Sequence, residues 1–111
     1  MKVKKARIIL KSLADDTRLR IINLLKIKEL SVNEICQVLG KEQSGVSKHL
    51  ARLRLTEIVG DRRAGNRVYY FLSKPPNKAH KEFLAAITKG LADVEIFKKD
   101  ANKLQKRRKK P

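Results

Sequence analysis

A run of short polar and basic side chains over residues 43–52 carries groups that could recognise DNA. Donors and acceptors recur there at the spacing of an exposed helix face: Gln43, Ser44, Ser47, Lys48, His49 and Arg52. An α-helix fits the major groove, where the amide of Gln43 could pair bidentately with adenine. Lys48 and Arg52 suit phosphates, which fix register without reading sequence. His49 has two interpretations, a phosphate contact or a local structural hydrogen bond, and we expect the DNA contact.

Three arginines form a second basic group further along the chain. Arg62, Arg63 and Arg67 flank Gly65-Asn66, a dipeptide typical of a hairpin turn. Guanidinium groups at such a tip, with Asn66 beside them, would reach a minor groove and its flanking phosphates. The other interpretation is a solvated hairpin whose arginines serve solubility. We expect the hairpin to be a second contact with DNA.

The helices that position the first group follow from capping signals and apolar spacing. Ser31 and Glu34 have the spacing of a capping box, and the helix that they open is expected to end at Gly40. The next helix is predicted over residues 42–56, with Val46 and similar apolar residues facing inward. Two helices joined by so short a turn predict a helix-turn-helix.

The flanking elements complete the predicted domain. Earlier helices are expected over residues 6–13 and from Asp15 or Asp16, where an aspartate can act as a cap. Strands of β-branched and aromatic residues are predicted over 58–63 and 67–72, which places a hairpin directly after the helix-turn-helix.

The C-terminal third predicts one long helix that begins at Asn77, after the Pro75-Pro76 break. Its apolar residues recur at steps of three or four: Phe83, Ile87, Leu91, Val94, Phe97, Ala101 and Leu104. A domain this small has no other predicted element that could cover such a stripe, so we expect the same helix of a second subunit to cover it. The dimer interface is expected at Phe83, Ile87, Leu91 and Val94, with support from the first helix.

Composition limits the class of protein. With 111 residues the chain is expected to be one domain, and its net charge of +17 implies a polyanionic partner. No apolar run is long enough to span a membrane or to form a signal peptide, so a cytoplasmic protein is expected. The fold class expected is mainly α with a small β-hairpin, a winged helix-turn-helix over residues 1–104 that is dimeric through its terminal helices. Residues 105–111 are expected to be a disordered basic tail.

Three segments in this order resemble the ArsR/SmtB family of winged helix-turn-helix repressors. They are LADDTRLRI at residues 13–21, VSKHL at 46–50 and DRRAGNRVYY at 61–70, and the resemblance covers about residues 6–104. It implies a homodimer that represses transcription by occupying an operator and is usually released by an inducer, which is unknown here. Glu42 and Glu57 depart from the serine and the glycine usual in the family.

The family's soft-metal site is not matched. Many members read Glu-Leu-Cys-Val-Cys-Asp-Leu at the start of the third helix, whereas residues 29–35 read ELSVNEI, with Ser31 and Asn33 in place of the cysteines. A hydroxyl and an amide are poor ligands for a soft ion. The last helix offers His80 but no second histidine, so we expect no metal and no cofactor. Cys36, beside apolar residues, is expected to be a buried, inert thiol.

Two other classes of function remain to be weighed. A nucleoid-type protein would bind nucleic acid through charge alone and would show no preference among sequences. An enzyme is not expected, because His49 and His80 lie in different predicted elements and no glycine-rich phosphate loop is present. We therefore expect a sequence-specific DNA-binding regulator, with double-stranded DNA as its partner.

Overall fold

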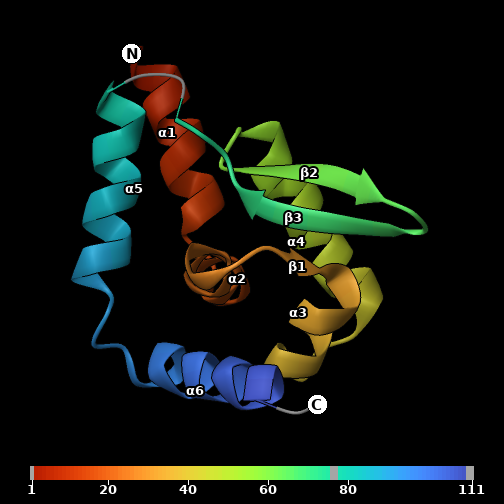
Figure 1. Cartoon of the computed structure of the whole chain (residues 1–111). Coiled ribbons are helices and arrows are strands. Elements are labelled where there is room, and N and C mark those ends of the chain that lie inside the picture. The colour runs from red at the N-terminus through yellow and green to blue at the C-terminus, as the bar shows by residue number, and fades with distance from the viewer. Residues whose placement is uncertain (1, 76–77, 110–111) are drawn as a thin grey trace.

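The computed structural model describes residues 2–75 and 78–109 (Figure 1). Within this part the chain is mainly helical, with one small sheet, as the sequence predicts. Its elements are α1 (Val3–Leu13), α2 (Asp16–Ile27), β1 (Leu30–Ser31), α3 (Val32–Leu39), α4 (Gln43–Leu55), β2 (Val59–Ala64), β3 (Arg67–Leu72), α5 (Lys78–Gly90) and α6 (Glu95–Lys109). None of the helices described is both long and apolar enough to cross a membrane.

Helix α2 lies at the centre of the molecule, and the other helices surround it (Figure 1). Because it is covered on several sides, four of its apolar residues are buried: Ile21, Ile22, Leu24 and Leu25. The neighbouring helices fill the space around it with the buried residues Ile9, Leu13, Ile35, Val38, Val46, Leu50 and Leu53. This apolar contact between helices is the main source of the fold's stability.

The helix-turn-helix forms where the capping signals predict it. Ser31 Oγ accepts the Glu34 backbone N–H at 3.2 Å, and the Glu34 carboxylate accepts the Ser31 N–H at 2.9 Å. These two bonds satisfy donors that the start of α3 would otherwise leave exposed. Gly40 then ends the helix with φ +66°, a conformation that glycine adopts without steric cost. The predicted capping box and C-terminal glycine are both confirmed.

The turn from α4 into the wing uses an unusual residue. Glu57 has φ +62°, in the left-handed region that favours glycine. Its backbone N–H donates to the Arg54 carbonyl at 3.0 Å, and the Ile58 N–H donates to the Leu53 carbonyl at 2.9 Å. This pair of bonds is a Schellman motif, which closes the C-terminus of α4. The chain therefore keeps the turn that a glycine would make, with a glutamate held under strain.

The wing is a β2–β3 hairpin with a two-residue turn. Ala64 pairs with Arg67, and Gly65 at the first central position has φ +64°, as a type II′ turn requires. The short strand β1, which the sequence did not predict, pairs with β3 through Leu30↔Tyr70. The sheet order β1-β3-β2 thus ties the wing to the start of α3.

The prediction of one long C-terminal helix was wrong. The chain forms α5 and α6 with a non-helical segment at residues 91–94, and the predicted start at Asn77 lies outside the described residues. Gly90, at the end of α5, is a poor helix former. The break also turns α6 across α2 and α3, where Phe97 and Leu104 become buried. These two residues therefore pack within their own subunit, whereas the sequence predicted that a second subunit would cover them.

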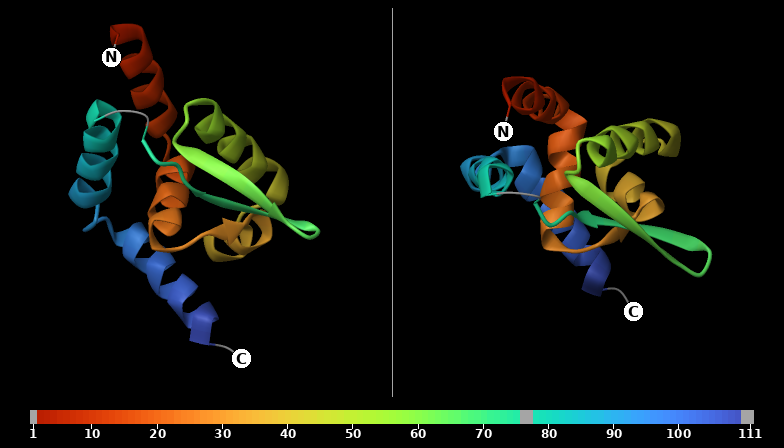
Figure 2. Two further views of the ribbon diagram at one scale, coloured as in Figure 1. Left: turned by 45° about the horizontal axis from the view of Figure 1, so that its top comes forward. Right: turned by 90° about the horizontal axis from the view of Figure 1, so that it is seen from above.

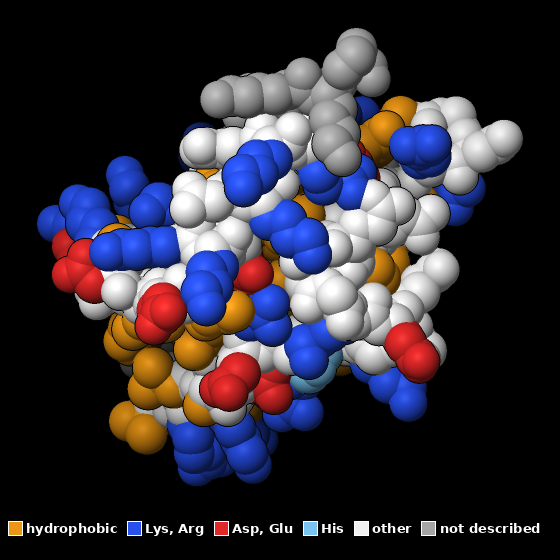
Figure 3. Space-filling model, turned by 90° about the horizontal axis from the view of Figure 1, so that it is seen from below, with side chains coloured by type: hydrophobic (Ala, Val, Ile, Leu, Met, Phe, Trp, Pro, Cys, Tyr) orange, Lys and Arg blue, Asp and Glu red, His pale blue; other side chains and the backbone are white. Residues whose placement is uncertain are grey.

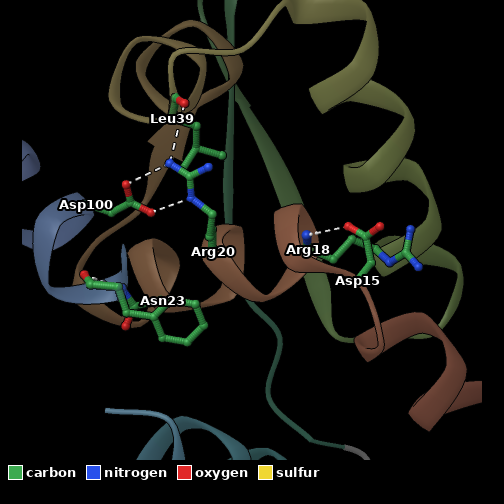
Figure 4. A network of polar contacts seen from close by, with 7 residues as sticks. Asp15, Arg18, Arg20, Asn23, Leu39 and Asp100 are labelled. Atoms are coloured by element: carbon green, nitrogen blue, oxygen red, sulfur yellow. Dashed lines mark hydrogen bonds and ion pairs between the residues drawn. The ribbon is translucent and has the colours of Figure 1, made fainter. Parts of the chain in front are cut away.

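Polar contacts hold α6 against the core. The Arg20 guanidinium on α2 donates to both oxygens of Asp100 on α6, at 2.8 and 2.9 Å (Figure 4). It also approaches the Leu39 carbonyl at the end of α3, at 3.5 Å. The Asn23 amide donates to the Phe97 carbonyl at 3.1 Å. Figure 2 shows how α6 consequently runs away from α5 instead of continuing its direction.

The disorder of the basic tail from residue 105 stays a prediction, but helix α6 extends into this segment. The helix continues to Lys109, and residues 110 and 111 lie outside the described part. Lysine, arginine and glutamine are good helix formers, and basic residues suit the negative end of a helix dipole. Once Leu104 is anchored, the extra turn therefore needs no apolar partner.

Candidate nucleic-acid interface

One face of α4 is exposed and polar. Val46, Leu50 and Leu53 are buried against the core and so fix which side of the helix faces outward. The predicted base-reading and phosphate-binding residues lie on the remaining surface, with Gln43, Ser44, Lys48 and Arg52 exposed and Ser47 half-buried. A Cβ added at Gly45 would meet nothing within 4 Å, so packing inside the subunit does not require this glycine.

The start of α4 and the wing meet at a shallow groove of about 280 Å³. Gln43 from α4 and Asn66 and Arg67 from the wing line it, together with Ser31 and Asn33 from the start of α3. Residues more than twenty positions apart in the sequence are thus brought to one concave surface. The structure thus brings these three predicted site residues to the same groove.

The wing arginines are not equivalent. Arg62 Nε donates to Glu29 Oε1 at 2.7 Å, and its guanidinium lies 5.0 Å from the centre of the Tyr69 ring. Its charge is therefore partly compensated within the subunit. Arg63 and Arg67 are exposed and have no acidic partner in the described part of the chain. Their charges are therefore not compensated within the subunit and are available to bind a polyanion.

Another ion pair joins α4 to the wing. Arg54, near the end of α4, lies 3.1 Å from the carboxylate of Asp61 on β2. Because Arg54 is largely exposed, this pair adds little stability, about 0–1 kcal/mol. It does keep the arginine at the junction of the two candidate DNA-binding elements.

His49 differs from the other predicted site residues. Its side chain is half-buried, and its Nδ1 lies 3.1 Å from Arg18 Nη1 at the start of α2. Asp15, the cap of α2, accepts the Arg18 backbone N–H at 3.0 Å (Figure 4). Burial alone would raise the pKa of the Asp15 carboxyl, but this hydrogen bond and the nearby His49 and Arg18 lower it. His49 thus contacts a side chain of its own subunit, at the start of α2.

Sequence reasoning missed Arg18 as a candidate functional residue. Its motif, LADDTRLRI, contributed to the family resemblance, but no periodicity links it to His49, 31 positions away. Only the packing of α2 against α4 brings the two side chains together.

Ser31 and Asn33, which stand at the positions of the family's metal-binding cysteines, make other contacts in this structure. The side chain of Ser31 is engaged in the capping box, and Asn33 lines the groove beside the wing. Cys36 is half-buried, and burial raises the pKa of its thiol, which disfavours the reactive thiolate. Within residues 2–75 and 78–109, no three His, Cys, Asp or Glu side chains gather as a metal site would need.

The model of the arsR family of bacterial regulatory proteins matches residues 15–60, which run from the cap of α2 to the start of the wing. The regulator KmtR of Mycobacterium tuberculosis is 41% identical over 58% of this chain and 49% of its own length, so this chain spans about half of it. The transcriptional activator HlyU of Vibrio cholerae is 41% identical over 72% of this chain and 74% of its own length.

Solved structures agree with these relationships. HlyU from Vibrio cholerae superposes with a TM-score of 0.71 at 33% identity, over 84% of this chain and all of that one. A homodimeric winged helix-turn-helix DNA-binding domain from Mycobacterium bovis gives a TM-score of 0.68 at 27% identity, over 82% of this chain and 81% of that one. The predicted winged helix-turn-helix is confirmed, and the chain belongs to the ArsR family of bacterial regulatory proteins.

Proposed function

We propose that this protein acts in the cytoplasm as a homodimeric repressor that occupies a palindromic operator. One observation carries the proposal: Gln43, at the start of the exposed polar face of α4, and Arg67, an uncompensated arginine of the wing, line the same groove. A helix of this kind reads the major groove, while a wing grips the adjacent backbone. The net charge of +17 supplies the long-range attraction to DNA.

The proposed contacts divide by chemistry. Gln43, Ser44 and Ser47 have short donors and acceptors that suit base edges. Lys48, Arg52, Arg63 and Arg67 suit phosphates, with Asn66 at the tip of the wing. Arg62 would have to break its ion pair with Glu29 before it could bind a phosphate, so its contribution to DNA affinity is expected to be smaller than that of Arg63 or Arg67.

The dimer surface is proposed on α1 and α5, which lie on the same side of the molecule (Figures 1 and 2). Helix α1 exposes three large apolar side chains: Val3 to 82%, Ile8 to 45% and Leu10 to 46%. A cluster of exposed apolar side chains is typical of a surface that another protein covers. Phe83 and Ile87 of α5 are only half-buried. The homodimeric neighbour from Mycobacterium bovis supports the formation of a dimer.

The apolar surface continues at the bend between α5 and α6. A groove of about 400 Å³ is lined there by five apolar residues and two charged ones: Leu19, Leu91, Val94, Ile96, Phe97, Asp16 and Arg20. Figure 3, which views the α6 side, shows hydrophobic side chains gathered at one corner of a surface otherwise rich in lysine and arginine. We propose that the partner subunit covers Leu91 and Val94.

The test is selection of binding sites from random-sequence duplexes with the purified full chain at physiological salt. A repressor of this type should enrich a two-fold symmetric site that it binds at least about 10³-fold more tightly than unrelated DNA. A nucleoid-type protein would enrich no sequence, although its affinity would fall as steeply with salt. The absence of any enriched site would therefore reject the proposal.

A further inference from the structure

A single guanidinium group joins the first helix to the proposed reading helix. Arg18 Nε donates to the backbone carbonyl of Ser12 near the end of α1. Arg18 Nη1 lies 3.1 Å from His49 Nδ1 in the middle of α4. Ser12 is fully buried, so its carbonyl depends on partners within the protein. Arg18 therefore bridges two helices that are far apart in the sequence.

The direction of the His49 bond follows from chemistry. A guanidinium group only donates, so His49 Nδ1 must be the acceptor in this contact. Asp15 Oδ2 lies 3.7 Å from the same nitrogen, which is too long for a hydrogen bond. The side chain of His49 is consequently oriented by Arg18, while Asp15 holds Arg18 through its backbone N–H.

A second contact ties α4 to the same point of α1. The hydroxyl groups of Ser12 and Thr56 lie 3.3 Å apart, and Thr56 caps the last turn of α4. The Ser12 hydroxyl donates to the Ile9 carbonyl at 2.9 Å, so the Thr56 hydroxyl is the donor between the two hydroxyls, and the Leu53 carbonyl, at 3.2 Å, is its alternative acceptor. His49 and Thr56 are separated by about 10 Å along the helix, at 1.5 Å per residue. Two attachments so far apart fix the direction of α4 as well as its position.

We propose that Arg18 is a positioning residue that sets the orientation of α4 relative to α1, and that His49 acts with it instead of contacting DNA. This inference rests on the proposed function. Since α1 belongs to the proposed dimer surface, its orientation relative to α4 fixes the angle and distance between the two reading helices of a dimer. Arg18 would thereby determine which half-site spacing the dimer accepts.

The test measures affinity for the selected operator and for versions with one base pair inserted or removed at its centre. One base pair moves a half-site by about 3.4 Å and about 35°, so the wild type should lose about tenfold or more in affinity. Arg18→Lys keeps the charge, but its single ammonium cannot bridge Ser12 and His49. This variant should bind all three spacings within about threefold of one another.

Two variants of His49 separate the hydrogen bond from mere packing. His49→Asn places an amide oxygen near the position of Nδ1 and should retain the spacing preference, whereas His49→Leu should lose it. Arg52→Gln, an exposed change on the same helix, should weaken all spacings alike. Unfolding midpoints and sedimentation establish that each variant is folded and dimeric.

The outcomes distinguish the two proposals. If the wild type selects no operator, the proposed function fails. If it selects an operator but either tolerates all spacings or keeps its preference in both Arg18→Lys and His49→Leu, the positioning role is rejected. If His49→Asn weakens every spacing as Arg52→Gln does, His49 contacts DNA after all.

Discussion

Arg20 on α2 and Asp100 on α6 form a two-pronged ion pair, with Nε–Oδ2 and Nη2–Oδ1 distances of 2.8 and 2.9 Å. Asp100 is only 3% exposed, and its hydrogen bonds raise the pKa of Arg20 above its ordinary value. The pair links the last helix to the central one, 80 positions away in the sequence. It is the most deeply buried charge contact in the described part of the chain.

Asp100→Ala should destabilise the fold. Removal of the carboxylate leaves Arg20, whose side chain is 16% exposed, with incomplete hydration, and the free energy of unfolding should fall by about 2–3 kcal/mol. Urea unfolding followed by circular dichroism measures the change. Glu95→Ala, which breaks an exposed pair with Lys99 on the same helix, serves as the control and should cost less than about 0.5 kcal/mol. An equal decrease in the free energy of unfolding in both variants would show that the buried pair stabilises the fold no more than the exposed pair does.

Glu57→Gly should stabilise the protein. The left-handed backbone of Glu57, with φ +62°, costs a residue with a Cβ about 1 kcal/mol that glycine does not incur. The midpoint of urea unfolding should therefore rise. Glu57→Ala removes the same carboxylate but keeps the Cβ, so it should bring no such gain. If both variants were stabilised equally, charge and not backbone strain would be the cause.

His80 should make stability fall in mild acid. Burial lowers the pKa of His80 from the ordinary 6.5, with a further lowering from the charge of Lys5. The unfolded chain therefore binds a proton that the native protein resists, so stability is complete above pH 6.5 and is lost as the pH falls below it. The loss can reach about 1.4 kcal/mol per pH unit.

Urea unfolding at several pH values between 7.5 and 5 measures this dependence. His80→Leu should give a flatter profile in that range, because it removes the buried imidazole whose pKa is lowered in the native protein. An unchanged slope in His80→Leu would assign the acid sensitivity to other groups.

Base reading and phosphate binding should separate by mutation. Gln43→Ala should reduce discrimination at particular base pairs of the operator by about 1–3 kcal/mol. Arg67→Ala should weaken binding to every sequence and reduce the salt dependence of affinity by about one phosphate contact. Competition binding with singly substituted operators at two or more salt concentrations reads out both effects. Reversed results would mean that the wing reads the sequence.

Leu91→Asp and Val94→Asp should produce monomers. Both residues line the apolar groove at the bend, and a charge there would be desolvated by a partner subunit. Sedimentation should show the loss of the dimer, and operator affinity should fall with it. Ala92→Asp, an exposed neighbour, is the matched control and should remain dimeric. A wild type that is monomeric at micromolar concentration would contradict the proposed interface directly.

Local signals predicted much of this structure from the sequence. The Ser31–Glu34 capping box, Gly40 and the turn at Gly65 each act within a few residues, so their effects are visible in the chain itself. The bend after Gly90 was not foreseen, because the apolar stripe keeps its spacing through the non-helical segment. Gly90 weakens the helix at this point, and the burial of α6 against α2 and α3, a contact that periodicity does not encode, stabilises the bend.

The candidate site shows the same division. The exposed residues of α4 follow from helical spacing, and the wing arginines follow from the position of the turn. The partners of Arg62 and His49, namely Glu29 and Arg18, come from other elements and depend on tertiary packing. Sequence reasoning therefore proposes which side chains contact DNA, but it does not show which of them already contact another residue of the same subunit.

The bend between α5 and α6 decides what a probe at the C-terminal end of the chain would report. Because α6 is anchored to α2 and α3, a spin label or fluorophore at exposed Lys106 would move with the helix-turn-helix of its own subunit. On a straight helix it would instead follow the dimer surface. The distance between two such labels in a dimer would thus track the separation of the reading helices, in free protein and on DNA alike.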